Sequence, residues 1–457
     1  MGALIPISLF GWIPVVLILF SILPARRAVI AAYLFAWLFL PVAGYDLPGF
    51  TNYNKITATT VGVLLGILIF DNRKLKELRP TWLDLPMLAF CVSPFLSSIS
   101  NGLGWYDGLS GASFKVLTWG LPYLTGRLYF SSLRGMQDLA TAIVIGGLIY
   151  VPLCLWEVRM SPQLHANIYG FMQHAFDQSR RGGGFRPMVF MHHGLMLSMW
   201  MATATLLSTH MWLSRARHEL YGMPMWMVSG VLFATTVLCK SSGATLLMLM
   251  GIGALLVMQR MKTALPILCL IGVPALYMGV RTNDTWSGEE ALTAASWISA
   301  DRAGSLKFRL DAEDRLAEHA MKRPIFGWGA WGRNFVTRSD ESSQMVVADG
   351  LWILTLGTQG LFGLIALFGA ALIPIYAFVL RYPPRHWHRP AFACAGVMAV
   401  ALSLYMIDNL VNAMVNPIFM LMSGALAGVA IARKPFVRTR KSRRVEVTLP
   451  VQAAGAS

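Results

Sequence analysis

The fold of this chain is decided by the stretch that follows its longest polar segment, which reads DGLWILTLGTQGLFG from Asp349 to Gly363. The preceding residues, 281–348, carry nine Lys or Arg and ten Asp or Glu, whereas residues 350–380 carry no charge at all. An α-helix needs about 20 predominantly apolar residues to cross the hydrocarbon core of a bilayer. The stretch therefore predicts a membrane-spanning helix that begins where a large water-exposed loop ends.

The composition extends this interpretation to the whole chain. Hydrophobic residues make up 56% of the 457 residues and charged residues 13%, and the mean hydropathy is +0.56. These values predict an all-α, polytopic integral membrane protein rather than a soluble domain. Apolar runs centre near residues 14, 36, 63, 91, 120, 148, 203, 232, 250, 272, 364, 400 and 424, which predicts about 12–13 transmembrane helices. Residues 1–23 have neither a basic start nor a cleavage motif, so we expect a retained first span.

The distribution of basic residues predicts the orientation. The net charge of +16 lies largely in alternate short loops and in the last 25 residues, which marks those parts as cytoplasmic. The same distribution favours a lipid bilayer over nucleic acid as a partner. The five cysteines are scattered, and none stands with a histidine at metal-ligand spacing, so neither a disulfide nor a metal site is expected.

These observations predict six regions. They are N-terminal transmembrane helices at 1–156, an Arg/Gly-rich periplasmic loop at 157–191, central transmembrane helices at 192–280, a large, partly helical periplasmic loop at 281–348, C-terminal transmembrane helices at 349–432 and a basic cytoplasmic tail at 433–457.

The first outer loop carries a pattern that suits a diphosphate. Arg180, Arg181 and Arg186 flank a glycine triplet at 182–184, and fork-shaped guanidinium groups beside a permissive backbone bind phosphate well. Arginines that only touch lipid headgroups are the alternative for the first two. His192 and His193 follow, either as a base or hydrogen-bond donor, or as interfacial anchors.

Lys240 interrupts an apolar stretch and precedes Ser241, Ser242 and Gly243. Its ammonium group is predicted either to face a polar cavity or to reach towards lipid headgroups. In the large loop, the apolar spacing predicts a helix from Asp301 to Lys322 that Pro324 ends.

Three arginines of that predicted helix are candidates for diphosphate binding. Arg302 and Arg309 share one edge of its apolar face, while Arg315 lies with His319 on another. Because the loop is nearly neutral, most of its charges are expected to be solvated, with one or two arginines functional. Asp349 stands at the mouth of the next span, as a candidate base or arginine partner, or simply as a helix cap.

The segment GWGAWG at 327–332 matches a dinucleotide-binding pattern, but no strand precedes it. A compact turn with tryptophans at the membrane interface is the better interpretation.

The order of these elements resembles the O-antigen ligase and O-antigen polymerase superfamily of bacterial membrane glycosyltransferases. The resemblance covers about residues 180–365 and rests on five elements. They are Arg186 to His193 before a span, Ser241-Ser242-Gly243-Ala244, Arg309, Pro324-Ile325-Phe326-Gly327-Trp328-Gly329, and Asp349 to Gly363.

The resemblance implies transfer of a glycan from an undecaprenyl-diphosphate donor to an acceptor hydroxyl, at the periplasmic face of the bacterial inner membrane. It implies an inverting, metal-independent glycosyltransferase of the C-type fold group that uses no cofactor. Arg186 and Arg309 match the family's diphosphate arginines. Asp349 falls where many ligases have their catalytic histidine. Ser242 occupies the place of a usual arginine, so that either Lys240 supplies the missing cation or that contact is absent.

Asp349 in place of a histidine favours an exopolysaccharide or O-antigen polymerase that joins lipid-linked repeat units. The alternative is a ligase that moves finished glycan to lipid A-core or protein. The expected partners are the undecaprenyl-diphosphate-linked oligosaccharide, a flippase and a chain-length regulator. A lipid or sugar transporter is less favoured, because the spans carry few charges, chiefly Asp408.

Overall fold

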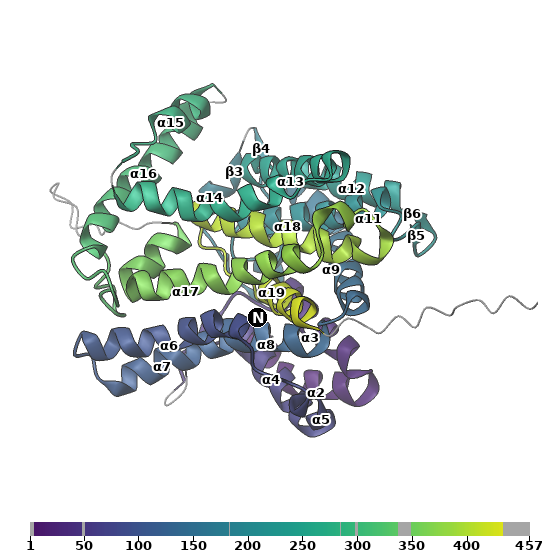
Figure 1. The fold of residues 1–457 in the computed structure, drawn as a ribbon, viewed down its shortest axis with the longest axis horizontal. Helices are drawn as coiled ribbons and strands as arrows, with labels where there is room; N and C mark the ends of the chain where they lie inside the picture. Colours follow the sequence, from purple (N-terminus) through teal and green to yellow (C-terminus); the bar gives the residue numbers. More distant parts are fainter. Residues whose placement is uncertain are drawn as a thin grey trace, which may run out of the picture.

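The computed structural model describes residues 4–47, 51–181, 183–283, 285–297, 300–336 and 349–432, without the side chains of residues 301 and 302. The predicted tail at 433–457 and the last part of the polar segment, 337–348, lie outside these residues. The described chain is mainly helical with very little strand, as predicted (Figure 1).

The helices follow one another along the chain with short connections. In the first half they are α1 (Leu4–Phe10), α2 (Trp12–Ile22), α3 (Ala25–Phe39), α4 (Lys55–Phe70), α5 (Asn72–Lys76), η1 (Trp82–Asp84), α6 (Leu85–Ser100), α7 (Trp105–Lys115), the π-helical turn η2 (Val116–Gly120), α8 (Leu121–Tyr129), α9 (Leu133–Met160), α10 (Leu164–Tyr169) and η3 (Phe176–Ser179). In the second half they are α11 (Gly194–Leu213), α12 (Met225–Leu238), α13 (Ser242–Met261), α14 (Leu265–Thr282), α15 (Glu289–Ser296), α16 (Ala300–Ala320), α17 (Leu351–Arg381), η4 (Pro384–His386), α18 (Pro390–Val411) and α19 (Pro417–Ile431).

Strand is confined to three short antiparallel hairpins among the described residues. They pair β1 (Gly44–Tyr45) with β2 (Tyr53–Asn54), β3 (Arg180–Arg181) with β4 (Gly184–Phe185), and β5 (Glu219–Leu220) with β6 (Met223–Pro224).

Six helices of the described chain are long and apolar enough to cross a membrane, or up to seven if the bent pair α1 and α2 is one span. This supports a polytopic membrane protein but is fewer than the 12–13 spans predicted. Each of the thirteen predicted centres nevertheless falls on a helix or on the turn η2. Part of the shortfall arises where a helix is broken or short, and the 20-residue α11 is long enough but is not among the helices apolar enough to qualify. A 41° bend divides α1 from α2, and α4, α12 and α19 are apolar but have fewer than 18 residues.

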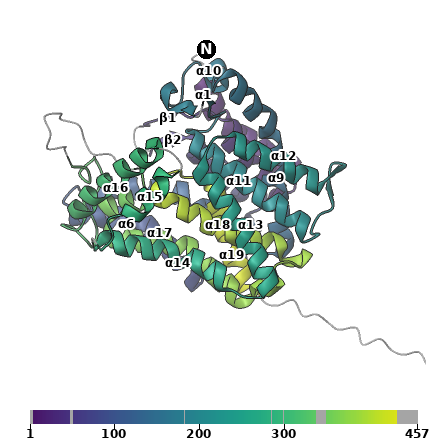
Figure 2. The same cartoon turned by 90° about the horizontal axis from the view of Figure 1, so that it is seen from above.

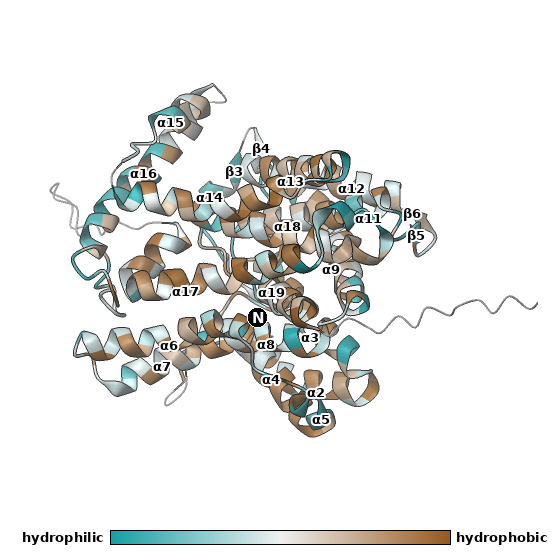
Figure 3. Ribbon diagram, in the orientation of Figure 1, coloured by the Kyte–Doolittle hydropathy of each residue, from teal (hydrophilic) through white to brown (hydrophobic). Residues whose placement is uncertain are grey.

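The helices pack around α17, α18 and α11, which contact helices from both halves of the chain. The α6–α7 hairpin lies against α17, and α16 contacts both α14 and α17 (Figures 1 and 2). Figure 3 shows that hydrophobic residues dominate α13, α14, α17 and α19, while α15 and α16 are the more hydrophilic helices. The helix predicted at 301–322 is confirmed, since α16 covers Ala300–Ala320.

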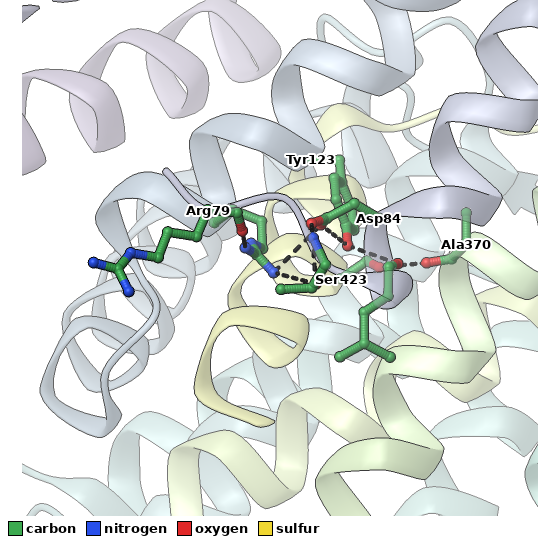
Figure 4. A network of polar contacts seen from close by, with 8 residues as sticks. Arg79, Asp84, Tyr123, Ala370 and Ser423 are labelled. Carbon is green, nitrogen blue, oxygen red and sulfur yellow. Dashed lines mark hydrogen bonds and ion pairs between the residues drawn. The ribbon is translucent and has the colours of Figure 1, made fainter. Parts of the chain in front are cut away.

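Close backbone contact joins α8 to α19. An added Cβ at Gly126 would meet the carbonyl oxygen of Leu421, and one at Gly424 would meet that of Tyr123. Small residues at a helix crossing let two backbones approach, which favours packing in lipid. Beside this crossing, Arg127 bonds Asp84 at 3.3 Å and the carbonyl oxygen of Arg79 at 3.0 Å (Figure 4). This buried network fixes the turn that begins α6.

A break in α17 receives the segment 324–329. Gly360 has φ 66° and ψ −167°, a conformation available essentially only to glycine. The interrupted helix leaves backbone groups that pair with that segment. Trp328 N–H donates to the carbonyl of Gly357 at 2.8 Å, and Leu361 N–H donates to that of Pro324 at 2.7 Å. Gly327 and Gly360 thus let the backbone of segment 324–329 pack directly against the backbone at the break in α17. This agrees with the compact turn predicted at 327–332.

Candidate functional site

The segment 186–193, between the β3–β4 hairpin and α11, is held in place by a buried carboxylate. Glu157, in the last turn of α9, accepts hydrogen bonds from the backbone N–H groups of Met188 at 2.8 Å, Val189 at 2.7 Å and Leu164 at 3.0 Å. Val189 has φ 51°, an uncommon conformation for a β-branched residue. Two of these hydrogen bonds come from the loop itself, and they hold Val189 in this conformation.

A buried lysine secures the same segment from the other side. Lys55, at the start of α4, donates from Nζ to the carbonyl oxygen of Phe190 at 3.0 Å and to that of Trp37 at 3.2 Å. Gln173 adds hydrogen bonds to the carbonyls of Val189 at 3.0 Å and Met191 at 3.2 Å. Three separate regions of the chain therefore converge on a loop that carries Arg186 and His193.

Arg186 and Lys240 interlock at the edge of this loop. The Arg186 side chain is 8% exposed, packs over Gly194, and donates from Nη2 to the carbonyl of Lys240 at 3.1 Å. Lys240, in the left-handed connection between α12 and α13, donates from Nζ to the carbonyl of Arg181 at 3.1 Å. Lys240 thus contacts the arginine loop, and its carbonyl helps position the guanidinium of Arg186.

His193 is buried and is the N-cap of α11. Its Nδ1 accepts the N–H of Leu195 at 3.0 Å, so in the neutral ring the proton resides on Nε2. Burial, followed by the charges of His174, Arg186, His192 and Arg309, lowers the pKa of His193 from 6.5 to about 3. The ring is consequently neutral near pH 7 and presents an N–H donor rather than a basic nitrogen.

Arg309 of α16 forms an ion pair with Asp349, with Nε and Oδ2 3.2 Å apart. The arginine side chain is 25% exposed and the aspartate side chain 55% exposed. The charge of Arg309 also acts on His193 and on Asp408, a buried residue near the end of α18. The predicted arginine and aspartate are therefore in contact, and the charge of the arginine is close enough to influence the predicted histidine.

The end of α18 completes this neighbourhood. Leu351 N–H donates to the carbonyl of Asn412 at 3.1 Å, which places the residues after Asp349 directly beside α18. Asn412 Nδ2 donates to Asp408 Oδ1 at 2.9 Å, while Asp408 Oδ2 and Asn412 Oδ1 have no hydrogen-bond partner among the described residues. Two buried acceptor oxygens therefore remain available close to Arg309.

The other predicted site residues have different surroundings. The Arg302 side chain is outside the described part of the structure. Arg315 is exposed on α16, away from that helix's buried face, and His319 instead stacks on Trp328 with ring centroids 4.3 Å apart. Arg181 is exposed on β3, and His192 is exposed beside His174, with ring centroids 5.9 Å apart.

Four residues that surround the site are not predicted as site residues from the sequence, and they are Lys55, Glu157, His174 and Asp408. Glu157 and Lys55 had a usable signal, because each is a charge at the end of an apolar run. Asp408 was recognised only as a charge within a span. His174 had no signal, since only the folded loop brings it to 4.5 Å, between ring centroids, from His193.

The arrangement combines two guanidinium groups, a neutral N–H donor and a half-exposed carboxylate at one place. Guanidinium groups suit diphosphate oxygens and a carboxylate can take a proton from a hydroxyl, so the set can support transfer from a diphosphate donor. Within the described ranges, no group of three or more His, Cys, Asp or Glu is arranged to hold a metal ion.

No protein-family model matches the chain, and no curated protein matches it.

Proposed function

We propose that this protein is a membrane glycosyltransferase of the polymerase type. It transfers a glycan from an undecaprenyl-diphosphate-linked donor to the acceptor hydroxyl of another lipid-linked repeat unit. The proposal places the site on the periplasmic side of a bacterial inner membrane, in a chain whose broken and shorter apolar helices bring the number of spans to about 12–13. It rests on the residue pattern described above and on the meeting of Arg186, His193, Arg309 and Asp349.

The single observation that supports this function most is the ion pair between Arg309 and Asp349, whose arginine charge also acts on buried His193. A cation that binds a diphosphate leaving group must be close to the base that activates the acceptor, because bond breaking and bond making share one carbon. The ion pair brings Nε of Arg309 to 3.2 Å from Oδ2 of Asp349. Donor binding would separate them and release both for their roles.

The roles follow from the chemistry of each group. Arg309 and Arg186 would stabilise the negative charge that develops on the leaving diphosphate. His193 would donate its Nε2 proton in a hydrogen bond to the same group or to the sugar. Asp349 would accept the proton of the acceptor hydroxyl, and the new glycosidic bond would form as the bond to diphosphate breaks, with inversion at the anomeric carbon. None of these proposed steps uses a metal ion or a cofactor.

Variants of three residues test this function in the bacterium that encodes the protein. Arg186→Ala, Arg309→Ala and Asp349→Ala are expected to remove long polymer and to accumulate single lipid-linked repeat units, while the protein stays folded and in the membrane. Arg26→Ala, which removes a similarly exposed ion pair with Asp138, is the matched control. Accumulated long lipid-linked chains would indicate a ligase, and full-length polymer in all three variants would contradict glycan transfer at this site.

A further inference from the structure

A cavity lined by both basic and apolar side chains lies at the opposite end of α11 from His193. It has a volume of about 380 Å³ and is lined by Trp212, Leu213, Arg215, Arg217, His218 and Trp226. His193 caps the first turn of α11 and Trp212 lies in its last turn. The 20 residues of this helix separate the two sites by about 30 Å, the thickness of a hydrocarbon core.

The two arginines of this cavity are not paired with a carboxylate of the described part of the chain. Among the described residues, neither Arg215 nor Arg217 forms an ion pair, whereas Arg127, Arg281 and Arg309 each pair with a carboxylate. Two unpaired guanidinium groups two residues apart provide a fork geometry that phosphate oxygens match. A cavity with this lining is therefore suited to an anion.

The surroundings of the cavity are apolar. Trp212 and Trp226 are 45% and 57% exposed, and tryptophan is enriched at the level of lipid headgroups. On α12, which begins beside the cavity, Met227, Val231 and Phe233 are also exposed. An acyl chain lying along this helix would cover these side chains while its headgroup occupies the cavity.

We propose that this cavity binds the phosphate headgroup of an anionic phospholipid, whose acyl chains lie along α12. The free phosphate ion shares the headgroup's charge but has no chains to cover the exposed apolar side chains, so the lipid is the occupant that the structure favours. The site is independent of the proposed glycan transfer, because it lies at the other end of α11.

Native mass spectrometry of the full-length protein, released from nanodiscs that contain phosphatidylglycerol as a minor component in phosphatidylcholine, tests this proposal. The wild-type protein is expected to retain phosphatidylglycerol. Arg215→Ala combined with Arg217→Ala is expected to retain it about tenfold less, because two charge-assisted hydrogen bonds are lost. Arg260→Ala, which removes a basic residue of α13 outside the cavity lining, is the matched control and is expected to retain the wild-type amount.

Two further arms make the outcome decisive. Arg215→Lys combined with Arg217→Lys keeps the charges and is expected to retain more lipid than the alanine variant, which separates binding from misfolding. Equal retention by the wild-type, alanine and lysine proteins would overturn the proposal. Release of phosphatidylglycerol by millimolar inorganic phosphate would also overturn it, because the cavity would then select a free anion rather than a lipid.

Discussion

At the scale of single residues, His193 is better placed to donate a hydrogen bond than to act as a base. Its Nδ1 already accepts the N–H of Leu195, and an asparagine there could both cap the helix and donate an N–H. We therefore expect His193→Asn to keep a substantial part of the activity, and His193→Ala to lose it and to destabilise the protein by about 1 kcal/mol. Polymer yield and thermal unfolding of the two variants check this. Equal loss of activity in both would favour a proton-transfer role for the ring.

Because the pKa of His193 is lowered in the folded protein, we expect the stability of the protein to depend on pH. The pKa of His193 is about 3 in the folded protein, below its ordinary value of 6.5, because of burial and the charges around it. As the pH falls below 6.5, the unfolded chain takes up this proton before the folded protein does. The contribution of neutral His193 to the free energy of unfolding is therefore fully present above pH 6.5 and declines as the pH falls from 6.5 to 3. Thermal unfolding from pH 8 to 4 should show a smaller decline for His193→Asn than for the wild type, and parallel declines would contradict this.

The ion pair of Arg309 and Asp349 is too exposed to stabilise the fold strongly. Exposed pairs contribute about 0–1 kcal/mol, so Arg309→Ala should shift the free energy of unfolding no more than Arg26→Ala does. Activity should separate the two variants, because only Arg309 lies beside His193 and Asp408. An inactive Arg309→Ala that is also unfolded would show that the pair is structural.

At the scale of elements, the break in α17 is the feature that depends most on one residue. An added Cβ at Gly360 would meet the carbonyl of Ile325, and its positive φ would be strained. We expect Gly360→Ala to destabilise the protein by about 3 kcal/mol and to release the segment 324–329. Gly253→Ala, in α13 with open space around it, is the matched control and should be neutral or slightly stabilising. Thermal unfolding measures both, and equal stability of the two variants would refute the docking role.

The elements also show how far the sequence could predict this protein. The helical class, the positions of the apolar helices and the helix α16 follow from apolar runs and periodicity, which are local properties of the chain. The break at Gly360 could not be predicted, because it depends on a partner segment some thirty residues earlier in the chain. The sequence predicts Asp349 as a base, as a partner for an arginine or as a helix cap, and the ion pair with Arg309 agrees with the second of these. The buried supports Glu157 and Lys55 were missed. Each is a charge at the end of an apolar run, which could have marked it, but its partners are backbone groups that leave no pattern in the sequence.

At the scale of the whole molecule, α16 is fixed to the helical core by a buried polar cluster. Glu313 accepts the hydroxyl hydrogen of Tyr277 at 2.7 Å and the indole N–H of Trp352 at 3.3 Å, and its Oε2 lies 3.6 Å from Nε of Arg281. Asp314 adds an ion pair to Arg281 at 2.6 Å. This cluster joins α14, α16 and α17, and so sets the position of Arg309.

Removing that anchor should loosen α16 without unfolding the core. Glu313→Ala leaves the buried guanidinium of Arg281 with one carboxylate fewer and should lower the free energy of opening of α16 by about 3 kcal/mol. Glu318→Ala, whose side chain is 80% exposed, should leave it unchanged. Hydrogen exchange of amides 303–320 measures the opening. Equal protection in the two variants would show that α16 is held by other contacts.

The most direct test of glycan transfer is reconstitution of the purified protein in nanodiscs with a radiolabelled undecaprenyl-diphosphate-linked repeat unit. The wild-type protein is expected to form longer lipid-linked chains and to release undecaprenyl diphosphate in step with each bond formed. Arg309→Ala and Asp349→Ala, folded to the same extent, should form neither product, whereas Arg26→Ala should form both. Chain growth in the Arg309 and Asp349 variants at the wild-type rate, or folded wild-type protein that forms no longer chain, would contradict the proposed function.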